Sequence, residues 1–325
     1  MNPVSSFKRL LKKTPFLKPV FDERNQLIEK NKLLQNELKK WKKGFVPPGH
    51  FYSPIPDFDS IAQDRATLSD PKYSINSCIS LNEQTQKEML DIFSQYYSEL
   101  PFGEAAENGN RYYLDNEYYA YSDGICLYSM MRHLKPKRFI EVGSGFSSCA
   151  ALDTAELFLS KMPEFTFIEP YPERLNNLLK PIDHHNPKIK IEVSLVQNVP
   201  LSMFESLEEN DILFIDSSHI SKIGSDVNFL FFNVFPILNK GVYIHIHDIF
   251  YPFEYPYAWI NNQRAWNEIY LLRSFLQWNE KFQIAYFNSY MENNFSKEVH
   301  SKLPLCMTPP TNAMTIPGSI WLKKV

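Results

Sequence analysis

The pattern of apolar and polar residues changes near residue 137, where short apolar runs begin to alternate with helical patterns. Short apolar runs bounded by turn residues are typical of buried strands, and strands that alternate with helices form parallel sheets. We therefore expect an α/β fold with a doubly wound, mostly parallel sheet, in which a helix over 262–278 precedes the last two strands. The seven predicted strands are 138–142, 165–169, 190–195, 211–216, 241–247, 282–288 and 319–325.

Upstream of this region, residues 20–43 contain neither Gly nor Pro and are rich in Leu, Glu, Lys, Gln and Asn, which predicts one continuous helix. One heptad seam of this helix carries Val20, Leu27, Leu34 and Trp41. The neighbouring seam has a single apolar residue, Leu38, so a self-standing coiled coil is not expected. Two interpretations remain: a helix that pairs weakly with a second copy to form a homo-oligomer, or an amphipathic helix that lies on its own domain.

A basic segment, FKRLLKKTPFLKPVF at residues 7–21, leads into this helix, and its Lys and Arg residues are interspersed with Phe and Leu. Basic amphipathic segments bind anionic membrane surfaces peripherally. Because Pro15 interrupts the pattern, we favour a solvated arm that packs on the protein or on a partner, with peripheral membrane contact as the alternative. The chain has no apolar run long enough for a transmembrane segment and no signal-peptide pattern, so we expect a cytoplasmic protein.

These patterns divide the chain into three regions. Residues 1–44 form the basic arm and the coiled-coil-like helix. Residues 45–136 form a linker rich in proline and aromatic residues and then a helical cap, with helices expected at 82–100 and 123–134. Residues 137–325 form the domain in which strands and helices alternate.

Composition narrows the function. The chain has 325 residues, of which 44% are hydrophobic, so it can bury a sizeable core. With a formal charge of -3 and a pI near 6.3, the protein has no overall positive electrostatic field that would attract nucleic acid. We therefore expect no nucleic-acid partner. The four cysteines form no C-x-x-C pair, which indicates neither a zinc site nor a disulfide framework and suits a reducing compartment.

The first predicted strand runs into a glycine turn, EVGSGFSSC, and a helical pattern follows. A dinucleotide-binding loop needs a third glycine where this chain has Ser148, so that interpretation loses support. The alternative is E-x-G-x-G, here Glu141, Gly143 and Gly145, which resembles motif I of the class I S-adenosylmethionine-dependent methyltransferases. Glu169 ends the second strand, where a carboxylate accepts hydrogen bonds from the ribose hydroxyls of an adenosyl group.

Two further motifs, DSSH and HIHD, follow the fourth and fifth strands, where ligands bind in open α/β sheets. Asp216 and Asp248 are hard oxygen ligands that suit one divalent cation such as Mg²⁺, and His219 follows one turn after Asp216. A cation lowers the pKa of a substrate hydroxyl, and a histidine then removes its proton as general base. The alternative is purely structural: such acids cap helices, and buried histidines satisfy hydrogen bonds.

From motif I to the C-terminus the chain resembles the class I methyltransferase fold, which is Rossmann-like and has an antiparallel last strand. The spacing of its acids is similar to that of the metal-dependent sugar O-methyltransferases related to macrocin O-methyltransferase, within the broader group that includes cephalosporin hydroxylase-like proteins. The resemblance implies that Asp216 and Asp248 hold the metal and that His219 is the base. It assigns cofactor binding to Glu141, Gly143, Gly145 and Glu169. The chain departs from the pattern by its additional histidines and by lacking an assignable third acidic ligand.

Two segments near the strand ends are candidates for contacts with the ligands. Gln197 follows the third strand, where this fold contacts adenine, and its amide suits hydrogen bonds to the adenine edge, although a plain turn is the alternative. The segment after Asp248 is rich in aromatic residues, which offer flat apolar faces to a ring. We expect His247, Phe253 and Tyr255 to contact the acceptor, unless the aromatic residues of this segment serve to anchor the loop.

The sequence therefore predicts an S-adenosylmethionine-dependent O-methyltransferase that acts on a sugar or glycan hydroxyl, with a small-molecule or glycan acceptor and a possible divalent metal. Two alternatives belong to other classes: a non-methylating, hydroxylase-like enzyme of the same fold, and a non-catalytic binding module of a glycan-assembly complex. The retained Glu141, Gly143, Gly145 and Glu169 argue against loss of the cofactor site.

Overall fold

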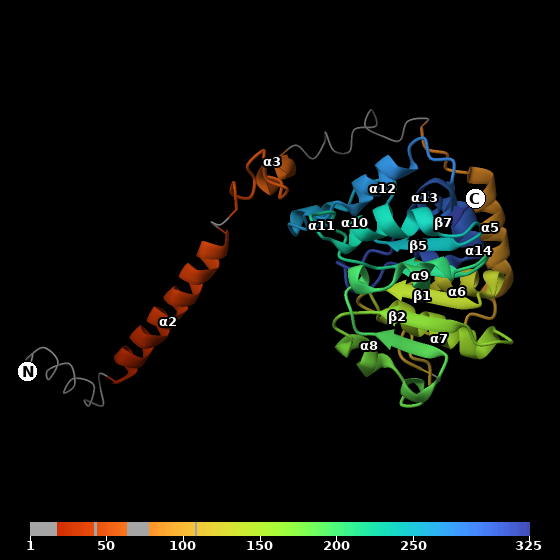
Figure 1. Cartoon of the computed structure of the whole chain (residues 1–325), viewed down its shortest axis with the longest axis horizontal. Helices are drawn as coiled ribbons and strands as arrows, with labels where there is room; N and C mark the ends of the chain where they lie inside the picture. Colours follow the sequence, from red (N-terminus) through yellow and green to blue (C-terminus); the bar gives the residue numbers. More distant parts are fainter. Residues whose placement is uncertain (1–17, 42–43, 64–77, 108) are drawn as a thin grey trace, which may run out of the picture. The chain divides into compact units, whose positions relative to one another are not determined.

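A computed structural model describes the chain except for residues 1–17, 42–43, 64–77 and 108 (Figure 1). The chain divides into two compact units, residues 1–65 and 66–325, and each is described here by itself. Of the basic segment at 7–21, predicted to pack on the protein or to touch a membrane, residues 7–17 lie outside the described residues and residues 18–21 begin a helix. No helix within the described ranges is long and apolar enough to cross a membrane.

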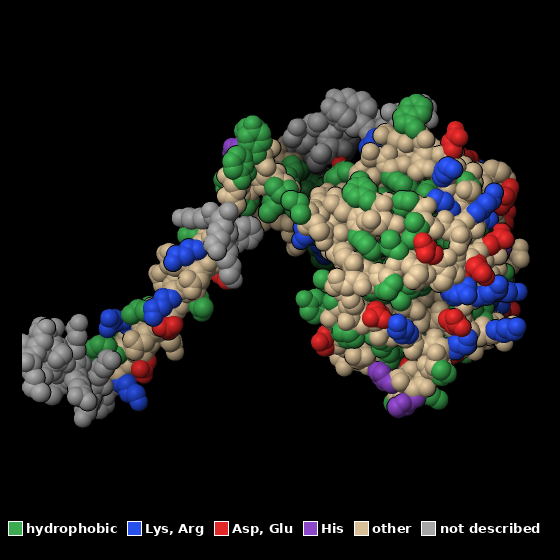
Figure 2. Space-filling view, viewed as in Figure 1, with side chains coloured by type: hydrophobic (Ala, Val, Ile, Leu, Met, Phe, Trp, Pro, Cys, Tyr) green, Lys and Arg blue, Asp and Glu red, His purple; other side chains and the backbone are tan. Residues whose placement is uncertain are grey.

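The first unit contains a long helix, α2 (Lys18–Trp41), and a short one, α3 (Phe58–Gln63). Pro19 lies in the first turn of α2, where its missing N–H is not needed by the helix. Val20, Leu27 and Leu34 are 59%, 60% and 60% exposed, so α2 buries none of these seam residues in its own unit. Apolar and charged side chains share the surface of α2 (Figure 2). Pairing with a second copy stays a prediction.

The second unit is built on a seven-stranded sheet in the order β3-β2-β1-β4-β5-β7-β6. Strands β1 to β5 are parallel, and β7 runs antiparallel to both of its neighbours, which confirms the predicted fold class (Figure 1). The strands are β1 (Arg138–Val142), β2 (Glu164–Ile168), β3 (Ile189–Glu192), β4 (Ile212–Ile215), β5 (Tyr243–His247), β6 (Phe282–Phe287) and β7 (Ser319–Lys324).

The apolar runs form strands because both faces of the sheet centre are covered. Every residue of β4 and β5 is buried, which excludes the alternating pattern of a half-exposed strand. Among the covering helices, α6 packs against both α5 and α7. The helices of this unit are α5 (Glu83–Tyr97), α6 (Ser122–Leu134), α7 (Phe146–Phe158), α8 (Glu173–Leu178), α9 (Leu201–Glu205), α10 (Asp226–Phe229), α11 (Tyr257–Asn261), α12 (Glu268–Leu276), α13 (Asn288–Asn294) and α14 (Ser296–Lys302).

One predicted helix begins later than expected. The pattern over 262–278 predicts a helix, but α12 begins at Glu268 and residues 262–267 are irregular. The reason is tertiary: the amides of Asn267 and Glu268 both donate to the carbonyl oxygen of His219 at 3.1 Å. The Asn267 side chain also accepts from the amide of Ser221 at 2.6 Å. These bonds fasten the start of α12 to the loop that follows β4.

Candidate active site

The glycine loop joins β1 to α7 and makes a tight turn against the end of β4. Gly143 has a φ of +82°, and a Cβ there would lie 1.8 Å from the carbonyl oxygen of Asp216. The amide of Gly145 donates to Ser148 Oγ at 3.1 Å. Ser148 therefore closes the turn from the position where a dinucleotide-binding loop has its third glycine.

Glu141 lies beneath this loop, fully buried. Its carboxylate accepts hydrogen bonds from Ser147 Oγ at 2.5 Å and from Ser148 Oγ at 2.6 Å. Burial raises the pKa of Glu141 to about 8, although the two hydroxyl hydrogen bonds oppose the shift. The carboxyl group is therefore largely neutral at pH 7, and it fastens the start of α7 to β1.

Glu169 and Gln197 lie near the same edge of the sheet. Glu169 Oε2 accepts from the amide of Ser144 in the glycine loop at 3.1 Å, and its Oε1 accepts from the amide of Tyr171 at 2.8 Å. Each oxygen keeps a lone pair for a further donor. Gln197, in the short η3 helix (Val196–Asn198), donates through Nε2 to the carbonyl oxygen of Gly224 at 2.8 Å, while its buried Oε1 has no partner among the residues that the structure describes.

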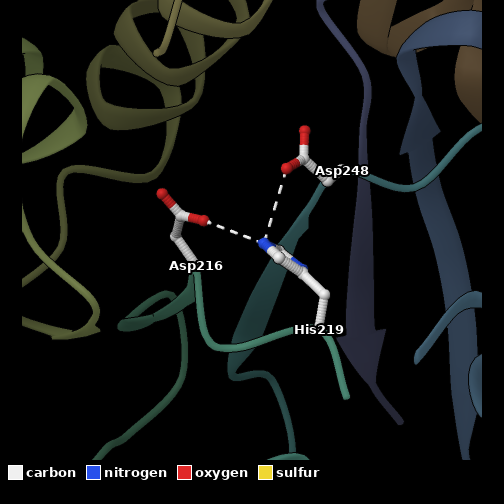
Figure 3. A group of neighbouring side chains, drawn as sticks. All are labelled: Asp216, His219 and Asp248. Atoms are coloured by element: carbon white, nitrogen blue, oxygen red, sulfur yellow. Dashed lines mark ion pairs between the residues drawn. The ribbon is translucent and has the colours of Figure 1, made fainter. Parts of the chain in front are cut away.

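Asp216, His219 and Asp248 converge at the carboxyl ends of β4 and β5 (Figure 3). His219 Nε2 lies 3.3 Å from Asp216 Oδ1 and 3.4 Å from Asp248 Oδ2. One donor atom from each of the three side chains lies within 4.8 Å of the others. His219 and Asp248 have φ values of +58° and +56°, which are uncommon for residues other than glycine and indicate that tertiary contacts hold both side chains toward the cluster.

A fourth side chain, Glu268 at the start of α12, contacts the ring nitrogen of His219 that faces away from the two aspartates. Its Oε2 lies 2.9 Å from His219 Nδ1, and Glu268 is fully buried. Burial disfavours a charged ring, but the hydrogen bonds with Asp216 and Glu268 outweigh it and raise the pKa of His219 well above its ordinary value. Burial also raises the pKa of Glu268, and the bond to His219 opposes that shift. The ring is thus fixed in orientation, with Nδ1 toward Glu268 and Nε2 toward the aspartates.

The pKa values of the two aspartates are shifted in opposite directions. Burial raises the pKa of Asp248 although His247 and His219 oppose it. For Asp216, whose side chain is 33% exposed, the neighbouring His247 and His219 overcome the effect of burial and lower the pKa. The pair therefore carries at least one negative charge at neutral pH, as a cation site requires.

The two histidines of HIHD have different surroundings. His245 is fully buried and stacks on Phe214 at 3.9 Å, and burial lowers its pKa well below the ordinary value, so its ring is a neutral part of the core. His247 Nε2 lies 3.4 Å from Asp248 Oδ1. Its Nδ1 lies 3.9 Å from Asp123 Oδ2 on α6. Burial is the main cause that raises the pKa of Asp123 to about 6.

A cavity of about 580 Å³ opens over this cluster. Its polar lining includes Asp216, His219, His247, Asp248 and Asp123. Trp259 and Trp266 form an aromatic wall, and Arg264 lies between them in the chain. Arg174 also lines the cavity, and its Cδ lies 3.3 Å from where a Cβ of Gly145 would be, so the cavity extends to the side of the glycine loop.

Only part of the predicted acceptor contacts line the cavity. His247 does, but Phe253 and Tyr255 are buried away from it at 0% and 5% exposure. The Phe253 ring packs on Phe287, and the Tyr255 hydroxyl accepts from the amide of Ile269 at 3.3 Å. In this structure both residues anchor the loop after Asp248, as the alternative interpretation stated.

Sequence reasoning missed Glu268, Asp123, Arg264 and Trp266. Glu268 has the local signal of an ordinary acidic residue in the first turn of a helix, and Asp123 has the same signal in α6. Their burial beside histidines far away in the chain is not visible in the sequence. Arg264 and Trp266 lie within the segment predicted to be helical, so their irregular backbone was not expected.

Comparisons with known proteins support an enzyme of the predicted class. Residues 140–249, from β1 to just past β5, match the model of a family described as a methyltransferase domain. The chain is 34% identical over 169 residues to a protein of Archaeoglobus fulgidus described as uncharacterized, covering 51% of this chain and 75% of that protein.

Solved structures with similar folds have low sequence identity to this chain. They include the SAH-bound methyltransferase PaMTH1 of Podospora anserina, at 14% identity and a TM-score of 0.39, covering 83% of this chain and 98% of that one. The O-methyltransferase of Bacillus cereus in complex with SAH has 13% identity and a TM-score of 0.42, covering 83% and 100%. Likeness at this level does not bear on the reaction of this chain. The family match identifies residues 140–249 as a methyltransferase domain, and the predicted enzyme class is confirmed.

Proposed function

We propose that this protein transfers a methyl group from S-adenosylmethionine to a hydroxyl of a sugar or glycan, with His219 as the general base. The observation that carries the proposal is the arrangement of His219. Its Nδ1 lies 2.9 Å from the buried Glu268, and its Nε2 faces a cavity between two aspartates. A histidine whose one nitrogen is held by a carboxylate presents the other nitrogen in a fixed orientation for proton transfer.

The glycine loop and its neighbours fit the methyl donor, which supplies an activated methyl group on a sulfonium. Gly143 permits the turn, and Glu169 keeps lone pairs for two ribose hydroxyls. The buried Oε1 of Gln197, which no described residue contacts by a hydrogen bond, suits the exocyclic amino group of adenine. Glu141 supports the loop from below by its bonds to Ser147 and Ser148. These side chains orient the donor at the edge of the sheet that borders the cavity.

The carboxylate oxygens of Asp216 and Asp248 fit a divalent cation, because both lie beside the cavity and hard oxygen ligands suit Mg²⁺, and His219 Nε2 is then left to accept a proton. Such a cation, Mg²⁺ or another, supplies positive charge that lowers the pKa of a nearby hydroxyl. His219 keeps the role of proton acceptor in this proposal, and Glu268 stabilises the imidazolium that results. The in-line displacement then needs only that the acceptor oxygen and the methyl carbon be held in contact.

A sugar hydroxyl is the favoured acceptor because the cavity combines flat apolar faces with acidic acceptors of hydrogen bonds. Trp259 and Trp266 supply the faces, and Glu117 and Asp123 line the same space. Sugars bind to sites of this composition through ring stacking and hydroxyl hydrogen bonds. The volume of about 580 Å³ lies within the range of small-molecule sites.

The test is a transfer assay with S-adenosylmethionine labelled at the methyl group and a panel of free sugars, nucleotide sugars and oligosaccharides. Each reaction is run with Mg²⁺, with Mn²⁺ and with EDTA. We expect labelled methyl ether on a sugar oxygen, with a loss of transfer in EDTA if the cation takes part. Transfer to nitrogen or carbon acceptors, with none to hydroxyls across the panel, would contradict the proposal.

A further inference from the structure

Two arginines of the cavity differ from other arginines of this unit in their partners. Arg111, Arg132 and Arg138 each form an ion pair with at least one carboxylate. Arg174 and Arg264 line the cavity, yet within the described ranges no carboxylate lies at ion-pair distance from either. A guanidinium has five N–H donors in a fixed planar fork that matches an oxyanion. Both side chains therefore have donors available to a ligand.

Arg264 is held by aromatic rings instead of by an acid. Its guanidinium carbon lies 4.3 Å from the ring centroid of Trp259 and 4.9 Å from that of Trp266. Trp259 is itself fixed, because its Nε1 donates to the carbonyl oxygen of Met314 at 2.9 Å. Stacking on indole orients a guanidinium and leaves its N–H edge free for hydrogen bonds. The side chain is thus oriented without using its donors.

The two arginines have different neighbours in the cavity. Arg174 is next to the glycine loop, near Gly145, and its guanidinium carbon lies 3.9 Å from the ring centroid of Tyr118. Its charge acts on Asp216, whereas the charge of Arg264 acts on Asp248. Arg174 is therefore beside the proposed donor site, and Arg264 is beside the aromatic wall that would hold the acceptor.

We propose that the acceptor is an acidic sugar, whose carboxylate or phosphate group is bound by Arg264 while its ring packs against Trp259 and Trp266. This inference rests on the proposed function for the identity of the site and adds the chemical class of its substrate. A carboxylate and a phosphate ester share the same bidentate match to a guanidinium, and both are therefore included. An acidic sugar offers the N–H donors of Arg264 a charged acceptor. A neutral sugar offers them only uncharged hydroxyl oxygens, which form weaker hydrogen bonds.

The first experiment compares matched sugars by calorimetry on the full-length protein without S-adenosylmethionine. Each acidic methyl glycoside, of glucuronate, galacturonate or mannuronate, is paired with its neutral parent, and the corresponding 6-phosphates form a second arm. We expect one acidic member to bind roughly 10- to 100-fold more tightly than its neutral partner, as for one charged hydrogen-bonded contact. The carboxylate and phosphate arms identify which oxyanion is recognised. If no acidic sugar of either arm exceeds its neutral partner, the inference is wrong.

The second experiment assigns the preference to Arg264. In Arg264→Gln the preference for the acidic sugar should fall to within about threefold of the neutral one, and Arg264→Lys should fall between the two because it keeps the charge and loses the fork. Arg174→Gln is the matched control: it should keep the preference and weaken S-adenosylmethionine binding. If Arg264→Gln still prefers the acidic sugar, another residue recognises the oxyanion and the proposed role of Arg264 is refuted. Should Arg264→Gln fail to fold, the comparison of sugars on the unaltered protein still decides the substrate class.

Failure of this inference is distinguishable from failure of the proposed function. Binding of an acidic sugar that depends on Arg264, without methyl transfer when S-adenosylmethionine is added, upholds the recognition and refutes the reaction. Methyl transfer to neutral and acidic sugars at equal kcat/KM upholds the reaction and refutes the recognition.

Discussion

At the scale of single residues, the cavity brings together charged groups that are largely buried and in contact with one another. His219 touches three carboxylates, from Asp216, Asp248 and Glu268. Each contact favours the imidazolium, so the ring can accept a substrate proton only in the fraction of molecules in which it is neutral, and that fraction rises with pH. A proton taken from a substrate would therefore be retained at His219 by charges already in place.

Replacing His219 by Asn should lower kcat by roughly 10²- to 10⁴-fold, the typical loss for a missing general base. S-adenosylmethionine affinity should stay within about twofold, because Glu169 and the glycine loop are unchanged. The measurement is steady-state transfer combined with calorimetric titration of the donor. His300→Asn, an exposed histidine on α14, is the control. Full activity in His219→Asn would remove this residue from the reaction.

Glu141 should make the stability of the protein depend on pH. Its pKa is raised from 4.5 to about 8 in the folded state, so the folded chain binds more protons than the unfolded chain between these values. Its stabilising contribution is complete below about 4.5 and is lost as pH rises through about 8.

We therefore expect Tm to fall more steeply between about pH 5 and pH 8 in the wild type than in Glu141→Gln, whose amide does not ionise. Differential scanning calorimetry at several pH values measures the difference. The exposed Glu205→Gln is the control and should follow the wild type. Identical pH profiles for Glu141→Gln and the wild type would show that Glu141 does not titrate in this range.

At the scale of elements, polar contacts fix how helices and loops meet around the sheet. Asn267 and the first amides of α12 bind the loop after β4, and this junction brings Glu268 to His219. A second junction is made by Arg111, fully buried in its side chain, which binds Asp153 and Glu156 on α7 and Asp183 in the following η2 segment (Asp183–His185). Such polar networks fix the relative orientation of helices and loops. Apolar packing alone would specify that orientation less well.

Replacing Arg111 by Met should destabilise the fold by about 3–5 kcal/mol, because Asp153 and Asp183 lose their buried cation and only the partly exposed Lys180, 3.9 Å from Asp153 Oδ1, remains beside them. Urea unfolding followed by circular dichroism gives the free energy of unfolding. The control is Lys188→Met, which removes an exposed pair with Glu164 and should cost about 0–1 kcal/mol. A loss below about 1 kcal/mol in Arg111→Met would mean that water or rearranged side chains satisfy both acids.

At the scale of the whole molecule, the catalytic unit and the N-terminal helix are separate compact units. The seam residues Val20, Leu27 and Leu34 are exposed on α2, and exposed apolar seams on a long helix favour self-association. On the face of the larger unit seen in Figure 2, basic and acidic side chains are interspersed. The helix is therefore the better candidate for assembly.

Deleting residues 1–43 should reduce the oligomer to a monomer and leave the catalytic unit folded, since the sheet and its core lie within residues 66–325. Light scattering of the full-length and shortened proteins measures the mass, and circular dichroism reports the fold. Leu27→Glu with Leu34→Glu in the full-length chain is a sharper variant, because it changes the seam without removing the helix. A monomeric full-length protein would refute assembly through α2.

Prediction from the sequence was most accurate where a local run of apolar residues is also buried in the folded protein. The central strands β1, β4 and β5 were predicted within a few residues because their apolar runs are buried, whereas the partly exposed edge strand β3 ends three residues before its predicted end at 195. Phe253 and Tyr255 illustrate the limit. An aromatic residue in a loop can face a cavity or the core, and here Phe287 and Ile269, both later in the chain, hold the rings inside.

The sequence by itself determined the strands, the glycine turn and the convergence of Asp216, His219 and Asp248. Asp216 and Asp248 directly follow the neighbouring parallel strands β4 and β5, whose ends lie together at one edge of the sheet, and His219 follows in the loop after β4. The tertiary structure alone decided that Glu268 holds His219 and that Arg264 lies on Trp259 and Trp266. The physical reason is that the burial and charge of a side chain depend on contacts between segments far apart in the chain, which no local pattern records.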